Sequence, residues 1–184
     1  NSVEIRDYQV NLANQAKNEN CLIILPTGLG KTVVALHVIA DYLTKGNGGV
    51  LFLAPTKVLV NQHYEFLKNT LAIDDIGMIT GEVLLTKRKK LWINSVICAT
   101  PEISRNDIAR KIVDTTQFNL IIFDEAHRAV GDYAYVEIAK QLSGSNVRLL
   151  GMTATLPSEK EKAKEICDNL HVRSLAERND SSPD

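Results

Sequence analysis

Short apolar runs alternate with longer amphipathic segments along almost the whole chain, and this alternation constrains the fold more than any other feature. Most of the runs lack polar alternation, as strands do when helices cover both faces of a sheet. The longer segments repeat apolar residues at helical spacing. The pattern predicts an α/β fold with a mostly parallel central sheet and helices on both faces. The predicted strands span residues 21–25, 50–54, 76–80, 95–100, 119–123 and 147–152, and the predicted helices span 6–17, 31–43, 58–71, 133–142 and 158–170.

Chain length and composition favour one domain. A chain of 184 residues, of which 45% are hydrophobic, can bury a complete core. We expect this domain to span residues 1–175, and the polar residues 176–184 to form a linker towards a further domain. The chain begins with Asn rather than Met, so we expect it to be a fragment of a longer protein.

The charge and the cysteines restrict the partners. A formal net charge of −1 gives no overall basic field, so any nucleic-acid contact must be local. Cys21, Cys98 and Cys167 lie far apart without CxxC spacing. This indicates neither a disulfide framework nor a zinc site, and it favours a reducing, intracellular and cytoplasmic location. No apolar run reaches membrane-spanning length, so we expect no membrane partner.

A glycine-rich loop stands between the first predicted strand and the following predicted helix. Glycines let backbone amides turn inward around phosphate oxygens, and the helix adds its positive N-terminal end. At this spacing Lys31 can reach the β- and γ-phosphates of a nucleotide, and the Thr32 hydroxyl can bind Mg²⁺. The alternative is an ordinary glycine-rich turn, because the usual pattern begins with Gly where this chain has Leu. The predicted phosphate-binding residues are Leu25, Pro26, Thr27, Gly28, Leu29, Gly30, Lys31 and Thr32.

Two adjacent carboxylates follow the strand predicted at 119–123. Ligands bind at the carboxyl ends of strands in open α/β folds, so Asp124 and Glu125 lie where a nucleotide would bind. Asp124 can hold Mg²⁺ through water, and Glu125 can orient and deprotonate an attacking water. The alternative is that both acids cap the next helix. His127 directly follows this pair and is predicted to share its function.

Hydroxyl-bearing residues or prolines also follow the other predicted strands. Hydroxyls, backbone amides and helix N-termini bind nucleic-acid phosphates without reading bases, although each position also suits helix capping. These residues are Pro55, Thr56 and Lys57 after the second strand, Thr80 and Gly81 after the third, Thr100 and Pro101 after the fourth, and Thr153 and Thr155 after the last.

This series, in this order, resembles motifs Ia, Ib, Ic and III of superfamily 2 helicases, and the glycine-rich loop and Asp-Glu-Ala-His resemble motifs I and II. The segment from Arg6 to Gln9 resembles the adenine-reading Q motif. The loop and residues 124–135 are similar to the archaeal Hef helicases and their Fanconi anaemia M relatives. The resemblance covers the chain from about residue 4 onward. It implies the first RecA-like P-loop NTPase domain of a DNA helicase, whose later domains are a helical insertion, a second motor domain and a nuclease.

The resemblance also implies individual roles. Gln9 would read the adenine edge of ATP, and Arg6 would stack on the adenine ring. Lys31, Asp124, Glu125 and His127 would be catalytic, and Thr32 and Asp124 would hold Mg²⁺. The coupling of hydrolysis to movement would involve Thr153 and Thr155, and the tracked DNA strand would contact Pro55, Thr56, Lys57, Thr80, Gly81, Thr100 and Pro101.

Three functional alternatives remain open. The leading one is an ATP-dependent motor on branched, fork-like DNA, which acts together with a second RecA-like domain of the same parent chain. A motor on double-stranded RNA would use the same phosphate contacts, which seldom distinguish the two nucleic acids. In isolation the chain would be a nucleotide- and DNA-binding module with little turnover.

Two weaker features carry separate expectations. The basic run 87–90 is interpreted as the solvated face of a helix, or alternatively as a patch for duplex phosphates. His37, His63 and His171 are expected to be structural or surface residues.

Overall fold

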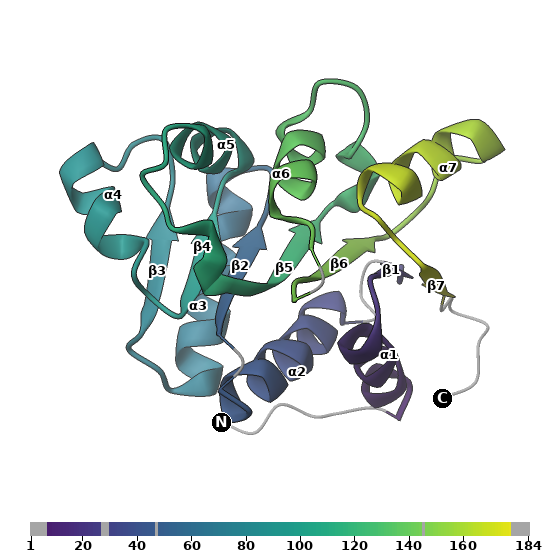
Figure 1. Cartoon of the computed structure of the whole chain (residues 1–184). Helices are drawn as coiled ribbons and strands as arrows, with labels where there is room; N and C mark the ends of the chain where they lie inside the picture. The colour runs from purple at the N-terminus through teal and green to yellow at the C-terminus, as the bar shows by residue number, and fades with distance from the viewer. Residues whose placement is uncertain (1–6, 27–29, 47, 145, 178–184) are drawn as a thin grey trace.

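Seven parallel strands form the central sheet in the part of the chain that the structure, a computed structural model, describes: residues 7–26, 30–46, 48–144 and 146–177 (Figure 1). The strands lie in the order β3-β4-β2-β5-β6-β1-β7, and every neighbouring pair is parallel. The predicted α/β fold is therefore confirmed. The strands are β1 (Cys21–Ile24), β2 (Gly49–Leu53), β3 (Ile76–Ile79), β4 (Val96–Ala99), β5 (Phe118–Asp124), β6 (Arg148–Thr153) and β7 (Ser174–Glu177).

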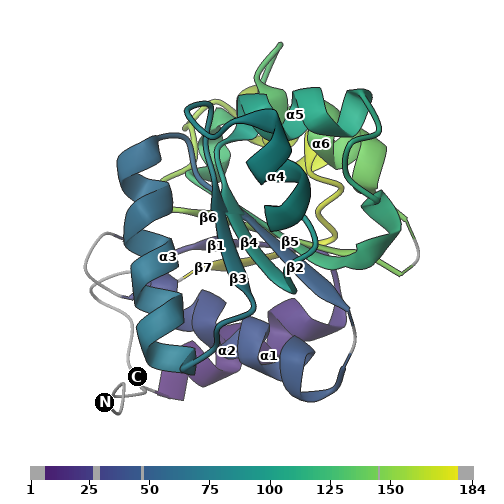
Figure 2. The ribbon, with the colours of Figure 1, turned by 90° about the vertical axis from the view of Figure 1, so that its left-hand side faces the viewer.

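Helices cover both faces of the sheet, as Figures 1 and 2 show. One face is covered by α1 (Asp7–Asn18), α2 (Lys31–Thr44) and α3 (Lys57–Leu71). The other face is covered by α4 (Leu85–Leu91), α5 (Pro101–Ala109), α6 (Ala134–Leu142) and α7 (Lys160–Asn169). Two short 3₁₀ helices, η1 (Thr115–Gln117) and η2 (Ala126–Arg128), flank β5. None of the helices among the described residues combines the length and apolarity that a membrane crossing requires.

The strands supply side chains to both cores because successive residues of a strand point to opposite faces. In β5, Leu120 and Ile122 pack in the core beneath α1, α2 and α3, whereas Ile121 and Phe123 pack in the core beneath α5 and α6. All four side chains are buried. A strand covered on both sides therefore reads as an uninterrupted apolar run.

Besides the two 3₁₀ helices, the structure adds one strand and one α-helix that were not predicted. Strand β7 pairs with β1 at the edge of the sheet and runs through Glu177, so the ordered domain extends two residues into the segment predicted as a linker. Among its first three residues only Ala176 is buried, so an apolar run is missing from its sequence. Helix α5 begins with Pro101 at its first position, which suits a helix start, but it has only a weak apolar stripe.

The basic run 87–90 lies in helix α4, and one of its members departs from the expected solvated face. Arg88 is buried and binds the carboxylate of Asp107 on α5 through Nε (2.9 Å to Oδ2) and Nη2 (3.1 Å to Oδ1). Its Nη1 donates to the carbonyl of Val83 at 2.7 Å, and the indole of Trp92 donates to the same carboxylate at 2.8 Å. The cluster joins α4, α5 and the loop after β3, whereas Lys87, Lys89 and Lys90 are exposed as expected.

We predict that Asp107→Ala lowers the free energy of unfolding by about 3–5 kcal/mol, because it leaves the buried Arg88 guanidinium without its counter-charge. Urea unfolding of the 184-residue chain measures the change. Lys89→Ala, an exposed position on the same helix, is the matched control and should change stability by less than about 0.5 kcal/mol. Equal stabilities of the two variants would contradict the assignment.

Candidate nucleotide-binding site

The predicted site residues gather at one edge of the sheet because every strand ends there. The register pairs Ile24 with Thr153 and Asp124 with Met152, so the ends of β1, β6 and β5 are neighbours. The amide of Leu25 donates to the carbonyl of Thr153 at 2.9 Å. The start of the phosphate-binding loop, the acidic pair and the last hydroxyl motif therefore lie side by side.

The described part of the glycine-rich loop leads directly into α2. Gly30 is the N-cap of that helix and has a left-handed backbone (φ 81°, ψ 45°). Its carbonyl accepts a hydrogen bond from Nε2 of the buried Gln9 at 3.3 Å, so α1 holds the start of α2. Lys31 and Thr32 form the first turn of α2 and are half-buried. The predicted ligands Arg6, Thr27, Gly28 and Leu29 lie outside the described residues.

The acidic pair faces the first turn of α2. Glu125 adopts a left-handed backbone (φ 54°, ψ 48°), which costs a residue with a Cβ about 1–2 kcal/mol. It stands at the N-cap of η2, yet its side chain makes no capping bond within the described chain. Instead, its Oε1 lies 3.9 Å from Nζ of Lys31. The strained turn thus directs Glu125 towards Lys31 in the first turn of α2, rather than towards the helix-capping role considered above.

His127 and Thr153 form a hydrogen-bonded chain beside the acidic pair. The Thr153 hydroxyl donates to the carbonyl of Thr155 at 2.9 Å and lies 2.9 Å from Nδ1 of His127. Because the single hydroxyl proton is used, Nδ1 must be the donor of the second bond. The same Nδ1 lies 3.5 Å from Oε2 of Glu125. The predicted coupling residues Thr153 and Thr155 are therefore joined to the predicted catalytic residues His127 and Glu125. Thr155 takes part through its backbone carbonyl, and its side chain is exposed.

Two residues that were not predicted hold Asp124. His63, on the buried side of α3, places Nε2 2.8 Å from Oδ2 of Asp124. The Tyr135 hydroxyl lies 2.7 Å from the backbone carbonyl of Asp124 and 3.2 Å from that of Leu53. Burial, followed by the neighbouring Tyr133 and the acidic pair, raises the pKa of Tyr135 well above its usual value, so the hydroxyl remains a donor. The sequence offered one sign that His63 is buried: it is a polar residue on the apolar face of α3.

The residues predicted to grip nucleic acid line the same edge, after β2, β3 and β4. Thr56 caps α3, since its hydroxyl accepts from the amide of Leu59 at 3.2 Å. Lys57 forms an exposed ion pair with Glu82, which joins the start of α3 to the loop after β3. Capping and surface pairing therefore occur at these positions. Of the predicted contacts, Thr56, Lys57 and Gly81 are exposed, Pro55 and Thr100 are half-buried, and Thr80 and Pro101 are buried.

A metal ion could be held by the predicted pair Thr32 and Asp124. The described residues contain no cluster of three or more His, Cys, Asp or Glu side chains suited to a metal. Mg²⁺ commonly uses one or two protein oxygens and takes its other ligands from nucleotide phosphates and water. One carboxylate at the end of β5 and one hydroxyl in the first turn of α2 fit that mode of binding.

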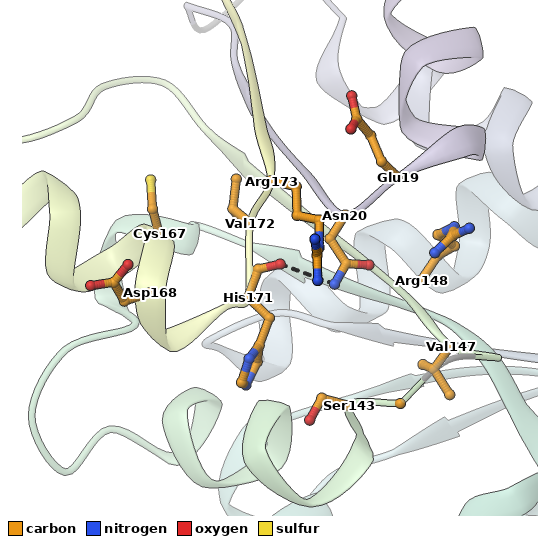
Figure 3. A pocket seen from close by; sticks show the side chains of 11 residues that line it. Glu19, Asn20, Ser143, Val147, Arg148, Cys167, Asp168, His171, Val172 and Arg173 are labelled. Atoms are coloured by element: carbon orange, nitrogen blue, oxygen red, sulfur yellow. Dashed lines mark hydrogen bonds between the residues drawn. The ribbon is translucent and has the colours of Figure 1, made fainter.

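A separate cavity of about 690 Å³ lies at the opposite edge, where β1, β6 and β7 begin (Figure 3). Its charged lining comprises Arg148, Arg173, Glu19 and Asp168, whose two positive and two negative charges cancel. It contains none of the predicted site residues. This cavity is therefore distinct from the candidate nucleotide site.

We predict that Gly30→Ala destabilises the chain by more than the strain of its backbone alone, which is about 1–2 kcal/mol. An added Cβ would lie 2.2 Å from Nε2 of Gln9. Gly131→Ala is the matched control, because Gly131 has a similar left-handed φ of 56° but nothing within 4 Å of an added Cβ. Urea unfolding without nucleotide compares the two variants, and a smaller loss for Gly30→Ala than for Gly131→Ala would refute the contact.

Comparisons with known proteins agree with this geometry. The family model described as type III restriction enzyme, res subunit, matches residues 2–158. The putative ATP-dependent RNA helicase MJ1505 of Methanocaldococcus jannaschii is 40% identical over 186 residues, a match that covers 100% of this chain and 24% of that protein. The ATP-dependent DNA helicase fml1 of Schizosaccharomyces pombe is 37% identical over 189 residues, covering 100% and 23%. The chain thus spans about a quarter of the length of these relatives.

The crystal structure of the Pyrococcus furiosus Hef helicase domain superposes with a TM-score of 0.94 and 42% identity, over 98% of this chain and 39% of that one. The similarity to Hef that was predicted from the motifs is therefore confirmed. With most of its length matched by the family model and almost all of it by the Hef domain, the chain belongs to the type III restriction enzyme res subunit family and is a RecA-like helicase motor domain of the Hef type.

Proposed function

We propose that this chain is the ATP-binding motor half of a DNA helicase or translocase that couples ATP hydrolysis to movement along DNA. The observation that carries the proposal is the contact of Lys31 with Glu125, continued through His127 to Thr153, at the carboxyl edge of the sheet. Two relatives, the DNA helicase fml1 and the Hef helicase domain, are named as helicases, and these names support a motor that acts on nucleic acid. A preference for branched, fork-like DNA rests on the similarity to Hef.

The side chains divide the chemistry between them. Lys31 would neutralise the β- and γ-phosphates, and Glu125, now facing Lys31, would orient and deprotonate the attacking water. Mg²⁺ bound by Thr32 and Asp124 would supply charge to offset the departing phosphate. His127 would couple Glu125 to Thr153, since its Nδ1 contacts both the Glu125 carboxylate and the Thr153 hydroxyl.

We infer that a second domain of the parent completes this site. The side chains of Lys31 and Glu125 remain 16% and 30% exposed, and the chain covers only part of its relatives. A second RecA-like domain of the parent would close over this edge and supply arginines, which can accelerate phosphoryl transfer about 10³–10⁵-fold. The isolated chain would then bind nucleotide weakly and hydrolyse it slowly.

We predict that Lys31→Ala in the full-length parent abolishes nucleotide binding and DNA-stimulated ATPase activity, whereas Glu125→Gln retains nucleotide binding and loses at least about 100-fold in kcat. Steady-state ATPase assays and nucleotide titrations separate the two effects. Normal DNA-stimulated turnover by the Lys31→Ala parent would refute the proposed site, whereas brisk turnover by the 184-residue chain alone would refute the need for a second domain.

The second candidate is a motor on double-stranded RNA, favoured by the name of the putative RNA helicase MJ1505. We predict that forked DNA stimulates ATP turnover by the parent at lower concentration than duplex RNA of equal length and salt. The measurement is the nucleic-acid concentration at half-maximal stimulation, with each polymer competed against the other. Stronger stimulation by RNA would transfer the proposal to the RNA motor, because phosphate contacts alone do not discriminate.

A further inference from the structure

We propose that His63 is a positioning residue for Asp124, and that its Nε2–H bond sets the affinity of the site for a metal–nucleotide complex. The inference rests on the proposed function, in which Asp124 helps to hold Mg²⁺. It concerns a residue that the sequence motifs did not include and that was expected to be a structural or surface residue.

The contact between the two side chains is short and buried. Nε2 of His63 lies 2.8 Å from Oδ2 of Asp124, and the two residues are 7% and 4% exposed. An ionised carboxylate can only accept hydrogen bonds, so Nε2 carries the proton and donates it. A hydrogen bond to a charged acceptor inside the protein is stronger than its solvent-exposed counterpart.

The second oxygen of Asp124 is also held. Oδ1 accepts a hydrogen bond from the backbone amide of Glu125 at 2.9 Å. The two donors fix the rotation of the carboxylate before any ligand arrives, while each oxygen keeps a further lone pair for a water or a metal. Since Tyr135 bonds the carbonyl of the same residue, Asp124 is fixed in both its backbone and its side chain.

The imidazole itself is held by packing. Its ring stacks on Phe52 of β2, with 4.4 Å between ring centroids and an interplanar angle of 24°. His63 also lies on α3, which begins at Lys57 and has Thr56 as its N-cap. The ring therefore connects the end of β5 to the helix that begins at the predicted nucleic-acid contacts. A flexible donor at this position would lose more entropy on holding the carboxylate than the stacked ring does.

The test separates the hydrogen bond from the stacking. His63→Phe keeps an aromatic ring against Phe52 but has no donor, whereas His63→Gln keeps an N–H donor. We expect His63→Phe to weaken binding of Mn²⁺ with ADP by about 10–100-fold, the usual effect of removing a group that orients a metal ligand. We expect His63→Gln to lose less than about 10-fold, since the donor remains although the ring is gone. Mn²⁺ electron paramagnetic resonance measures binding of the metal to the 184-residue chain in the presence of ADP.

A fluorescent ADP analogue in EDTA supplies the metal-free comparison, in which all three proteins should bind alike. Urea unfolding verifies that each variant is folded, and His63→Leu, which also lacks a donor, replaces His63→Phe if that variant is not. Wild-type Mn²⁺–ADP affinity in His63→Phe, or equal losses in His63→Gln and His63→Phe, would overturn the proposal.

Lys31→Ala distinguishes failure of this inference from failure of the nucleotide site. A loss of nucleotide binding by Lys31→Ala in EDTA, together with unchanged metal binding by His63→Phe, would reject only the role of His63. Unchanged nucleotide binding by Lys31→Ala would instead reject the nucleotide site itself.

Discussion

The order of the strands is the constraint on which the candidate site depends. Strand β5 lies between β2 and β6, and β6 lies beside β1, so three segments that are far apart in sequence end next to one another. Parallel pairing then places every strand end on the same edge. Lys31, Glu125 and His127 need no long loops to meet, because the sheet already sets their distances. A shift of one residue in β5 would turn Asp124 to the opposite face.

At the carboxyl ends of the strands, each of the two adjacent carboxylates has its own partners. Asp124 is nearly buried and receives hydrogen bonds from His63 and from the amide of Glu125. Glu125 is more exposed and lies between Lys31 and His127. The two adjacent carboxylates therefore have different surroundings, which suits different roles for one acid that binds and one that reacts. The left-handed backbone of Glu125 is the local cost of this separation.

Much of the fold followed from the sequence because strands covered on both faces are continuously apolar. The same reasoning failed at β7, where an edge strand with one buried side chain has no such run, and at α5, which has only a weak apolar stripe. The motifs placed Lys31, Glu125, His127 and Thr153 correctly at one edge. Arg88 was wrongly expected on a solvated face, and the contact of His63 with Asp124 was not predicted. Their partners, Asp107 and Asp124, are 19 and 61 residues away, and sequence spacing does not disclose such contacts.

The ion pair of Lys57 with Glu82 bears on how this edge would respond to salt. Lys57 stands in the first turn of α3, where the helix dipole disfavours a cation, and the carboxylate of Glu82 offsets that charge. A phosphate that approaches Lys57 must replace a carboxylate already in place. Such an exchange releases fewer condensed cations from the polymer than capture by an unpaired lysine would. Under the proposed strand contact, Lys57 would therefore contribute less than one full charge to the ionic-strength dependence of strand affinity.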